Sequence, residues 1–155
     1  MRIGMGYDIH RLEKGRRLVL GGIKIPFEKG LMGHSDADVL VHAACDALLG
    51  AAGLGDIGLH FPDTAVEFEN IYSIRLLEET HRMIKKKGFS IVNMDATVFA
   101  QRPKLAPFRK KMEKTIADAL DISDGRINIK STTTERLGVV GKGEAIGAMC
   151  VVLLD

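Results

Sequence analysis

The feature that most restricts the fold is a strand, a helix and a second strand between residues 89 and 131. Residues 89–100 alternate between apolar and polar side chains, which is typical of a strand with one buried face. The apolar set is Val92, Met94, Ala96, Val98 and Ala100. Pro107 suits the first turn of a helix that we predict to Leu120, and residues 126–131 are predicted as the second strand. Such a unit places its two strands parallel, with a right-handed crossover.

The N-terminal region is predicted to add strands to this sheet. Residues 2–10 form one, in which Gly4 and Gly6 leave room for the close approach of another backbone. Residues 16–26 contain Gly-Gly between two apolar runs, a pattern that predicts an antiparallel hairpin. We predict a loop over residues 27–33.

Two more helices are expected between the hairpin and residue 89. The first opens at residues 34–36, where Ser35 or Asp36 can cap it, and ends around residues 50–53. The second runs over residues 73–87, with His81 on its solvated surface. Between them, residues 55–64 form a long polar loop, and such loops in compact domains are often functional.

The last strand, residues 144–154, indicates how the sheet is covered. Residues 149–154 are apolar on both faces of that strand, which implies that both faces are buried. Helices can cover one face, and another subunit can cover the second. The predicted class is α+β (an α/β sandwich), a mixed sheet with helices packed on one face, in one domain over residues 1–155.

Composition excludes several classes of protein. The net charge of +2 and the absence of Trp argue against a nucleic-acid surface with stacked bases. No apolar run is long enough to span a bilayer, so no membrane partner is expected. Because residues 1–20 lack a signal-peptide pattern, we expect a cytoplasmic protein, or an organellar one if a transit peptide was removed. Cys45 and Cys150 lie among apolar residues and are predicted to be buried free thiols.

Asp8, His10 and His42 form the first candidate site. Residues two apart in a strand face the same side, so Asp8 and His10 offer one oxygen and one nitrogen ligand together. His42 lies off the apolar face of its helix and could be the third ligand, with Asp46 fixing its tautomer. The alternative is that these are solvated polar residues at a strand end and on a helix.

Two further stretches have both a functional and an ordinary interpretation. Residues 131–135, Ser-Thr-Thr-Thr-Glu, follow a strand and could hold phosphate oxygens, with Glu135 binding a hard cation. They could equally be a strand end followed by a turn. Residues 100–106 could recognise a nucleobase through backbone groups, or be a plain surface loop.

Taken together, the motifs resemble the 2-C-methyl-D-erythritol 2,4-cyclodiphosphate synthase family over essentially the whole chain. The resemblance rests on several short motifs in the family's order and spacing. They are Met1 to Gly4, Gly6 to His10, His34 to Asp38 followed by His42, Asp46 to Ala51, Gly55 to Gly58, Phe61 to Thr64, Lys130 to Glu135 and Gly141 to Glu144.

The resemblance implies an enzyme of the non-mevalonate route to isoprenoid precursors. Its substrate would be 4-diphosphocytidyl-2-C-methyl-D-erythritol 2-phosphate, a cytidine diphosphate derivative. The 2-phosphate attacks the β-phosphate, CMP leaves and a cyclic diphosphate forms. The family is homotrimeric, with each active site between two subunits.

Carried over by position, the resemblance assigns metal ligands and catalytic residues. Asp8, His10 and His42 would bind Zn²⁺, and Glu135 a second cation, Mg²⁺ or Mn²⁺. His34 and Thr133 would be catalytic, contacting the reacting phosphates.

The same resemblance assigns the substrate pocket. In addition to Asp8, His10, His34, Thr133 and Glu135, it comprises Ser35, Asp56, Ile57, Gly58, Phe61, Pro62, Asp63, Thr64, Ala65, Ala100, Gln101, Arg102, Pro103, Lys104, Leu105, Ala106, Thr132, Thr134, Val139 and Lys142.

Three positions depart from the family pattern. Ala65 replaces a frequent acid, while Val139 and Lys142 stand where some members have Phe and Arg. In those members the Phe and Arg close a cavity on the trimer axis that can hold an isoprenoid diphosphate. Lys142 keeps the charge but loses the planar fork of Arg.

Three other functions remain open at this point. A zinc hydrolase would use the same three ligands but incorporate water into its product. A non-catalytic trimer would bind an isoprenoid diphosphate without needing zinc. A zinc-free domain would use these motifs only as turns and caps.

Overall fold

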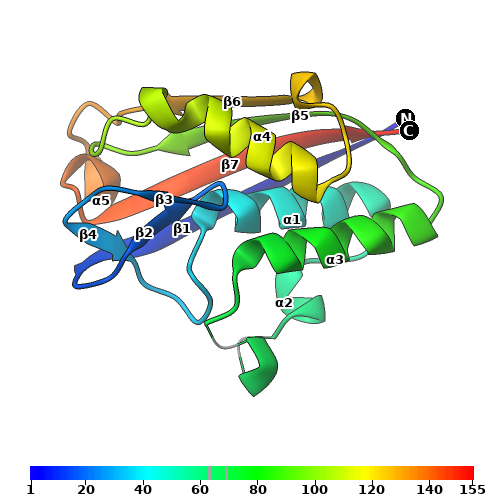
Figure 1. The fold of residues 1–155 in the computed structure, drawn as a ribbon, viewed down its shortest axis with the longest axis horizontal. Helices are drawn as coiled ribbons and strands as arrows, with labels where there is room; N and C mark the ends of the chain where they lie inside the picture. The colour runs from blue at the N-terminus through cyan, green and yellow to red at the C-terminus, as the bar shows by residue number, and fades with distance from the viewer. Residues whose placement is uncertain (63, 69) are drawn as a thin grey trace.

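The computed structural model describes residues 1–62, 64–68 and 70–155. Within them, five strands form a mixed sheet in the order β4–β1–β7–β5–β6, and β2 and β3 form a separate hairpin (Figure 1). The strands are β1 (Arg2–Lys14), β2 (Leu18–Leu20), β3 (Ile23–Ile25), β4 (Lys29–Leu31), β5 (Ile91–Phe99), β6 (Ile127–Thr132) and β7 (Ala145–Leu154).

Helices α1, α3 and α4 provide most of the helical layer. The helices are α1 (Val39–Ala52), α2 (Ile57–His60), α3 (Ser73–Lys86), α4 (Arg109–Ala119) and α5 (Gly138–Gly141), with short 3₁₀ turns η1 (Val66–Phe68), η2 (Ala106–Phe108) and η3 (Asp124–Arg126). None of the helices in the described ranges is long and apolar enough to cross a membrane.

Strand pairing confirms the predicted mixed sheet. β5 and β6 are parallel and are joined through α4, as the strand–helix–strand pattern requires. β7 pairs antiparallel with both β1 and β5, so the last strand lies at the centre of the sheet. The predicted hairpin is also present, with β2 and β3 antiparallel.

Close contact between β1 and α1 depends on two glycines. A Cβ atom on Gly4 would lie 2.0 Å from the carbonyl oxygen of Ala47, and one on Gly6 would lie 2.1 Å from that of Ala43. A side chain at either position would therefore push the helix away from the strand. The contact brings His42, one turn into α1, beside Asp8 and His10 of β1.

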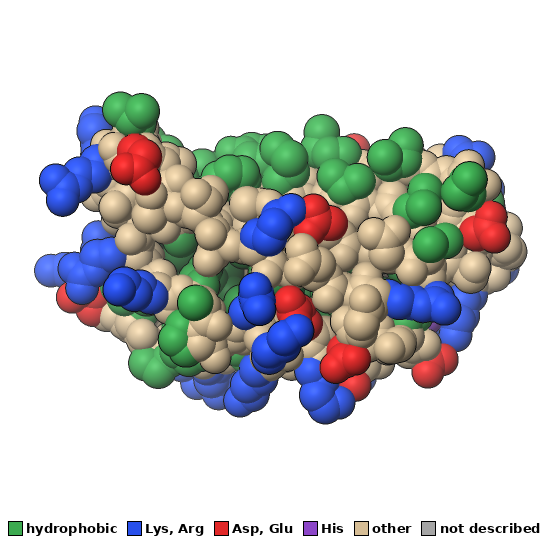
Figure 2. Space-filling model, turned by 90° about the horizontal axis from the view of Figure 1, so that it is seen from above, with side chains coloured by type: hydrophobic (Ala, Val, Ile, Leu, Met, Phe, Trp, Pro, Cys, Tyr) green, Lys and Arg blue, Asp and Glu red, His purple; other side chains and the backbone are tan. Residues whose placement is uncertain are grey.

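The other face of the sheet is apolar and exposed in the single chain. On β1, Ile3, Met5 and Tyr7 are 72%, 60% and 51% exposed, and Met149 on β7 is also exposed. Figure 2 shows hydrophobic side chains in a row along its upper border. A contiguous apolar surface of this kind usually marks an interaction site.

Several local predictions were wrong. The segment predicted as a loop over residues 27–33 contains β4, which pairs with the end of β1. The first helix begins at Val39 rather than at residues 34–36, because Ala37 has a φ of 58° and Asp38 is the cap. In addition, α2 lies within the predicted loop over residues 55–64.

Two side-chain placements also differ from expectation. His81 is 8% exposed rather than solvated, and burial and nearby Lys85 lower its pKa. Val92 is exposed because an irregularity in β5 between Ile91 and Asn93 shifts the alternation, so that Ile91 takes the buried place. Cys45 and Cys150 are buried free thiols, as predicted.

Asp38 joins the hairpin to α1. Its fully buried carboxylate accepts hydrogen bonds from the N–H groups of Gly21 at 3.0 Å, Gly22 at 2.6 Å and Val41 at 3.1 Å. Burial and the neighbouring charge of Asp36 raise the pKa of Asp38 to about 6, against the lowering effect of these donors.

Asp38→Asn should lower the free energy of unfolding by about 2–4 kcal/mol, measured by urea denaturation. All three partners are donors, so the amide NH₂ group must face an N–H group. Asp118→Asn is the matched control, because the exposed Asp118–Lys114 pair should contribute less than about 1 kcal/mol. Equal losses in the two variants would contradict this role of Asp38.

Candidate functional site

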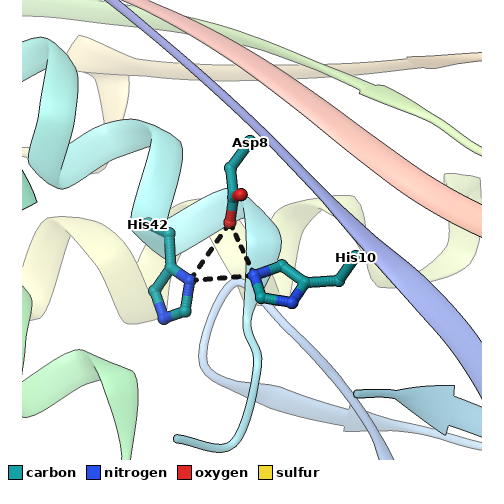
Figure 3. Close-up of side chains that lie close together, drawn as sticks. All are labelled: Asp8, His10 and His42. Atoms are coloured by element: carbon teal, nitrogen blue, oxygen red, sulfur yellow. Dashed lines mark hydrogen bonds and ion pairs between the residues drawn. The ribbon is translucent and has the colours of Figure 1, made fainter. Parts of the chain in front are cut away.

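Asp8, His10 and His42 converge on one point (Figure 3). Asp8 Oδ2 lies 2.8 Å from His10 Nε2 and 3.1 Å from His42 Nδ1, and the two nitrogens are 3.3 Å apart. Ligands held about 2.0 Å from a tetrahedral metal ion are about 3.3 Å from one another. The triangle therefore has nearly the size of one face of a tetrahedral metal site.

The outward nitrogens of both imidazoles have acceptors. His10 Nδ1 lies 2.6 Å from the carbonyl oxygen of Met32, an atom that can only accept, so this nitrogen carries a proton. His42 Nε2 lies 3.0 Å from Ser73 Oγ and 3.1 Å from Ser35 Oγ. When each outward nitrogen holds the proton of a neutral ring, the inward nitrogens present lone pairs to a cation.

Electrostatics of the triad also favour a positive charge at its centre. Burial raises the pKa of Asp8, but the contacts of its carboxylate with the His10 and His42 side chains outweigh burial and hold that pKa well below its usual range. Burial lowers the pKa of His10, but its contacts with Asp8 and the Met32 carbonyl raise it more. The donor set of one carboxylate and two imidazoles fits a divalent metal ion with a position left open.

A cavity of about 500 Å³ opens beside the triad. His10 and His42 line it together with four of the residues predicted for the substrate pocket on α2 and its flanks, and with two before α1. These six residues are His34, Ser35, Ile57, Gly58, Phe61 and Pro62. An ion at the triad would therefore face a pocket large enough for a small organic group.

Other predicted residues lie near this cavity without lining it. Asp56 is exposed and caps α2, its Oδ1 accepting from Leu59 N. The carbonyl oxygen of Ala65 lies 3.3 Å from Nε2 of His34, which does line the cavity. Thr64 is exposed, and Asp63 lies outside the described residues.

A second cavity, of about 180 Å³, lies where β5 and β6 end. The structure brings the two stretches predicted to hold nucleotide and phosphate together around it. Its lining residues are Ala100, Gln101, Pro103, Lys104, Leu105, Ala106, Ser131, Thr132 and Thr133. The predicted residue Arg102 belongs to the same loop but does not line the cavity.

The turn after β6 orients Thr133 and Glu135 toward each other. Thr133 Oγ1 donates to Glu135 Oε1 at 2.8 Å, and Glu135 and Arg136 have φ angles of 50° and 65°. Thr134 Oγ1 instead donates to the carbonyl oxygen of Leu137 at 2.8 Å. This left-handed turn leaves the Glu135 side chain exposed beside the second cavity.

The lining sets of the two cavities have no described residue in common. His10 and His42 of the candidate metal triad line the first cavity, and Thr133 lines the second. Val139 and Lys142 lie on and just after α5, are exposed, and line neither of these two cavities. One chain thus presents the predicted site as separate halves.

Comparison with known proteins identifies the family of the chain. The model of the YgbB family matches residues 1–155. The chain belongs to the YgbB family. Curated members named 2-C-methyl-D-erythritol 2,4-cyclodiphosphate synthase include one from Desulfatibacillum aliphaticivorans, 59% identical over 100% of both chains. Another, from Desulfosudis oleivorans, is 64% identical over 99% of this chain and 92% of the relative.

Solved structures of the family have the same fold. A synthase of that name in a form bound to CDP is 40% identical, with a TM-score of 0.91 over 99% of this chain and 100% of that one. A bifunctional protein from Campylobacter jejuni is 44% identical, with a TM-score of 0.95 over 99% of this chain and 42% of its own. The resemblance found from the motifs is therefore confirmed.

Sequence reasoning missed part of the lining of the first cavity. Met32, Gly33, Phe68, Ile71 and Leu76 also line the first cavity. Gly33 adjoins the His34 motif and could have been found from it, but the others are apolar residues whose positions give no signal before folding.

The predicted partner of His42 was also wrong. Asp46 Oδ1 accepts from Ile57 N at 2.7 Å and so holds the start of α2, while Ser35 and Ser73 contact the imidazole.

Proposed function

We propose that this protein converts 4-diphosphocytidyl-2-C-methyl-D-erythritol 2-phosphate to 2-C-methyl-D-erythritol 2,4-cyclodiphosphate and CMP. An oxygen of the 2-phosphate bonds to the β-phosphorus. The bond from that phosphorus to the oxygen bridging the α- and β-phosphates breaks, and CMP leaves with that oxygen. The observation that carries this proposal is the converging triad beside a cavity, in a chain 59% identical over its full length to a synthase of that name.

Asp8, His10 and His42 would hold Zn²⁺, to which two imidazoles and a carboxylate are suited. When bound, the ion would supply Lewis-acid stabilisation of phosphate charge. Around it, His34 and Ser35 would orient the methylerythritol and phosphate groups, and the walls at Ile57 and Phe61 would limit access of water. No side chain has to act as nucleophile, because the attacking oxygen belongs to the substrate.

Residues around the second cavity would hold the cytidine and its phosphates. Residues 100–106 and Thr132 would contact base, ribose and α-phosphate, and Thr133 would donate to the phosphate charge that develops during transfer. Glu135 would help bind a second cation, Mg²⁺ or Mn²⁺, since carboxylate oxygen is a preferred ligand of both.

A homotrimer would join the two halves of the site. The apolar face of β1 and β7 offers a surface for another copy of the chain. Because the two cavities are separate on one chain, that copy would supply the missing half of the site. In such a cytoplasmic trimer the chain would form one domain, and Val139 and Lys142 would lie near the axis. Lys142 would supply a charge for an isoprenoid diphosphate there, though not a bidentate contact.

Product analysis tests the proposed reaction. With the diphosphocytidyl substrate, Zn²⁺ and Mg²⁺, we expect CMP and the cyclic diphosphate in equal amounts. In ¹⁸O-labelled water neither product should contain the label. Incorporation of ¹⁸O would contradict the proposal and identify a zinc hydrolase, and CMP binding without turnover would indicate a binding protein.

Thr133→Ala should lower turnover by about 100-fold, the scale for loss of one donor to developing charge. The affinity for CMP should change little, because loop 100–106 supplies most of that pocket. Steady-state kinetics and CMP titration separate the two effects. Thr115→Ala, at an α4 hydroxyl that donates to the Lys111 carbonyl oxygen, is the control. A collapse of CMP binding in Thr133→Ala would contradict the role given to Thr133.

A further inference from the structure

A group of polar side chains, of which Ser35 and Ser73 are buried and Asp36 is half-buried, lies behind His42, on the side away from Asp8 and His10. Ser73 Oγ lies 3.0 Å and Ser35 Oγ 3.1 Å from His42 Nε2, and the two hydroxyl oxygens are 3.3 Å apart. Asp36 completes the group without touching the imidazole. Its carboxylate accepts from the Ser73 hydroxyl and, at 3.1 Å, from the Ser73 backbone N–H.

The number of hydrogens in this group determines the direction of each bond. A carboxylate at Asp36 can only accept, so the single hydroxyl hydrogen of Ser73 points to Asp36. Ser73 Oγ then has only lone pairs left for His42. Nε2 of His42 must carry a hydrogen to make this bond, and in the neutral imidazole Nδ1 then keeps its lone pair toward Asp8 and His10.

Ser35 alone does not determine which nitrogen of His42 carries the hydrogen. Its oxygen accepts from Ala37 N at 3.0 Å, but its own hydrogen can point either to Ser73 or to His42 Nε2. If it pointed to Nε2, the proton of the neutral imidazole would sit on Nδ1, where a metal ion has to bind. The fixed orientation of the Ser73 hydroxyl therefore distinguishes the two tautomers.

We propose that Asp36 and Ser73 are positioning residues that select the His42 tautomer able to bind metal. Asp36 acts through Ser73 and does not touch the metal site. The inference rests on the proposed metal site, and it gives Asp36 a role beyond the helix capping that the sequence suggested.

Burial makes the selection effective. Ser73 is fully buried, so bulk water does not reach its hydroxyl to replace the bond to His42. Asp36 is also held in place, because its N–H donates to the Ile71 carbonyl oxygen at 3.0 Å and its Oδ1 accepts from Asp38 N at 3.2 Å. The backbone bond from Ser73 N ties the start of α3 to the same carboxylate.

The test measures Zn²⁺ affinity of the full chain by competition with a chelator, without substrate. Ser73→Ala should bind Zn²⁺ about 10- to 100-fold more weakly, the range for loss of an outer partner of a metal-ligating imidazole. Asp36→Asn should also weaken binding, because every partner of this carboxylate is a donor. Ser73→Thr keeps the hydroxyl and should restore most of the affinity. Asp46→Asn is the matched control, one turn from His42 but bonded to Ile57 N, and should change affinity much less.

A spectroscopic measurement separates positioning from general loss of structure. In the Zn²⁺-loaded chain labelled with ¹⁵N at histidine, the Nε2–H signal of His42 should be present and slow to exchange with water. In Ser73→Ala that signal should broaden or exchange faster while thermal unfolding remains cooperative. Unchanged affinity and an unchanged signal in folded Ser73→Ala and Asp36→Asn would overturn the proposal. Failure of the unmodified chain to bind Zn²⁺ would instead overturn the proposed metal site.

Discussion

Loss of bound metal and of CMP release is the expected result of replacing His42 with alanine. His42 Nδ1 supplies one corner of a triangle whose sides measure 2.8, 3.1 and 3.3 Å. Without it, Asp8 and His10 remain as two ligands, too few for a stable site of this kind. Loss of an outer-shell partner already costs about 10- to 100-fold in metal affinity or activity, so loss of a direct ligand should cost more than about 100-fold.

Three measurements on the His42→Ala variant check this result. Elemental analysis gives metal per chain, the diphosphocytidyl substrate gives the rate of CMP release, and light scattering gives the assembly state. The proposed trimer should remain assembled, because His42 faces the first cavity and not the apolar face of the sheet. His60→Ala is the control for metal content, since His60 Nε2 lies 2.7 Å from the Leu54 carbonyl oxygen, away from the triad. Full turnover in His42→Ala would refute the metal assignment.

Gly4→Ala should produce the largest loss of stability among the substitutions considered. The added Cβ would lie 2.0 Å from the Ala47 carbonyl oxygen and 2.5 Å from Ala51 N, both on the backbone of α1. Neither atom can move aside without shifting the helix, and overpacking a core commonly costs about 1–3 kcal/mol or more. Because the clash is with backbone rather than a flexible side chain, we expect a loss above about 3 kcal/mol, measured by urea denaturation.

Gly50→Ala tests whether the effect is steric. Gly50 lies inside α1, and a Cβ there would meet nothing within 4 Å. The same substitution should then stabilise the protein by about 0.5–1 kcal/mol, because alanine is the better helix former. Similar destabilisation at positions 4 and 50 would show that the close approach of β1 to α1 does not determine the cost.

Much of the fold was predictable from the hydrophobic periodicity of the sequence, because that periodicity reflects which side chains of an element are buried. The strand–helix–strand unit over residues 89–131 and the Gly-Gly hairpin are both present as predicted. Patterns failed where a neighbour changed the local geometry. The irregularity at Val92 reversed its face, and the three-residue strand β4 is too short to show a period before it pairs with β1.

The candidate site was likewise predictable only in part. Spacing placed Asp8 and His10 on one face, and the position of His42 off the apolar face of its helix made it the candidate third ligand. The structure brings His42 within 3.3 Å of His10. The second partner of His42 was not predictable in the same way. Asp46 has the helical spacing for it, but its carboxylate lies toward Ile57 N, and Ser73, 31 residues away from His42, takes the place.

By itself, the sequence determined the class of sheet, the family and the candidate metal ligands, because these follow from short-range periodicity and from motifs with set spacing. Only the tertiary structure decided that the α1 cap is Asp38, that Asp36 holds Ser73 behind His42, and that the predicted pocket lies in two separate cavities on one chain. The physical reason is that each of these depends on which distant backbone and side-chain groups meet when α1 packs on β1. No pattern along the chain records those contacts.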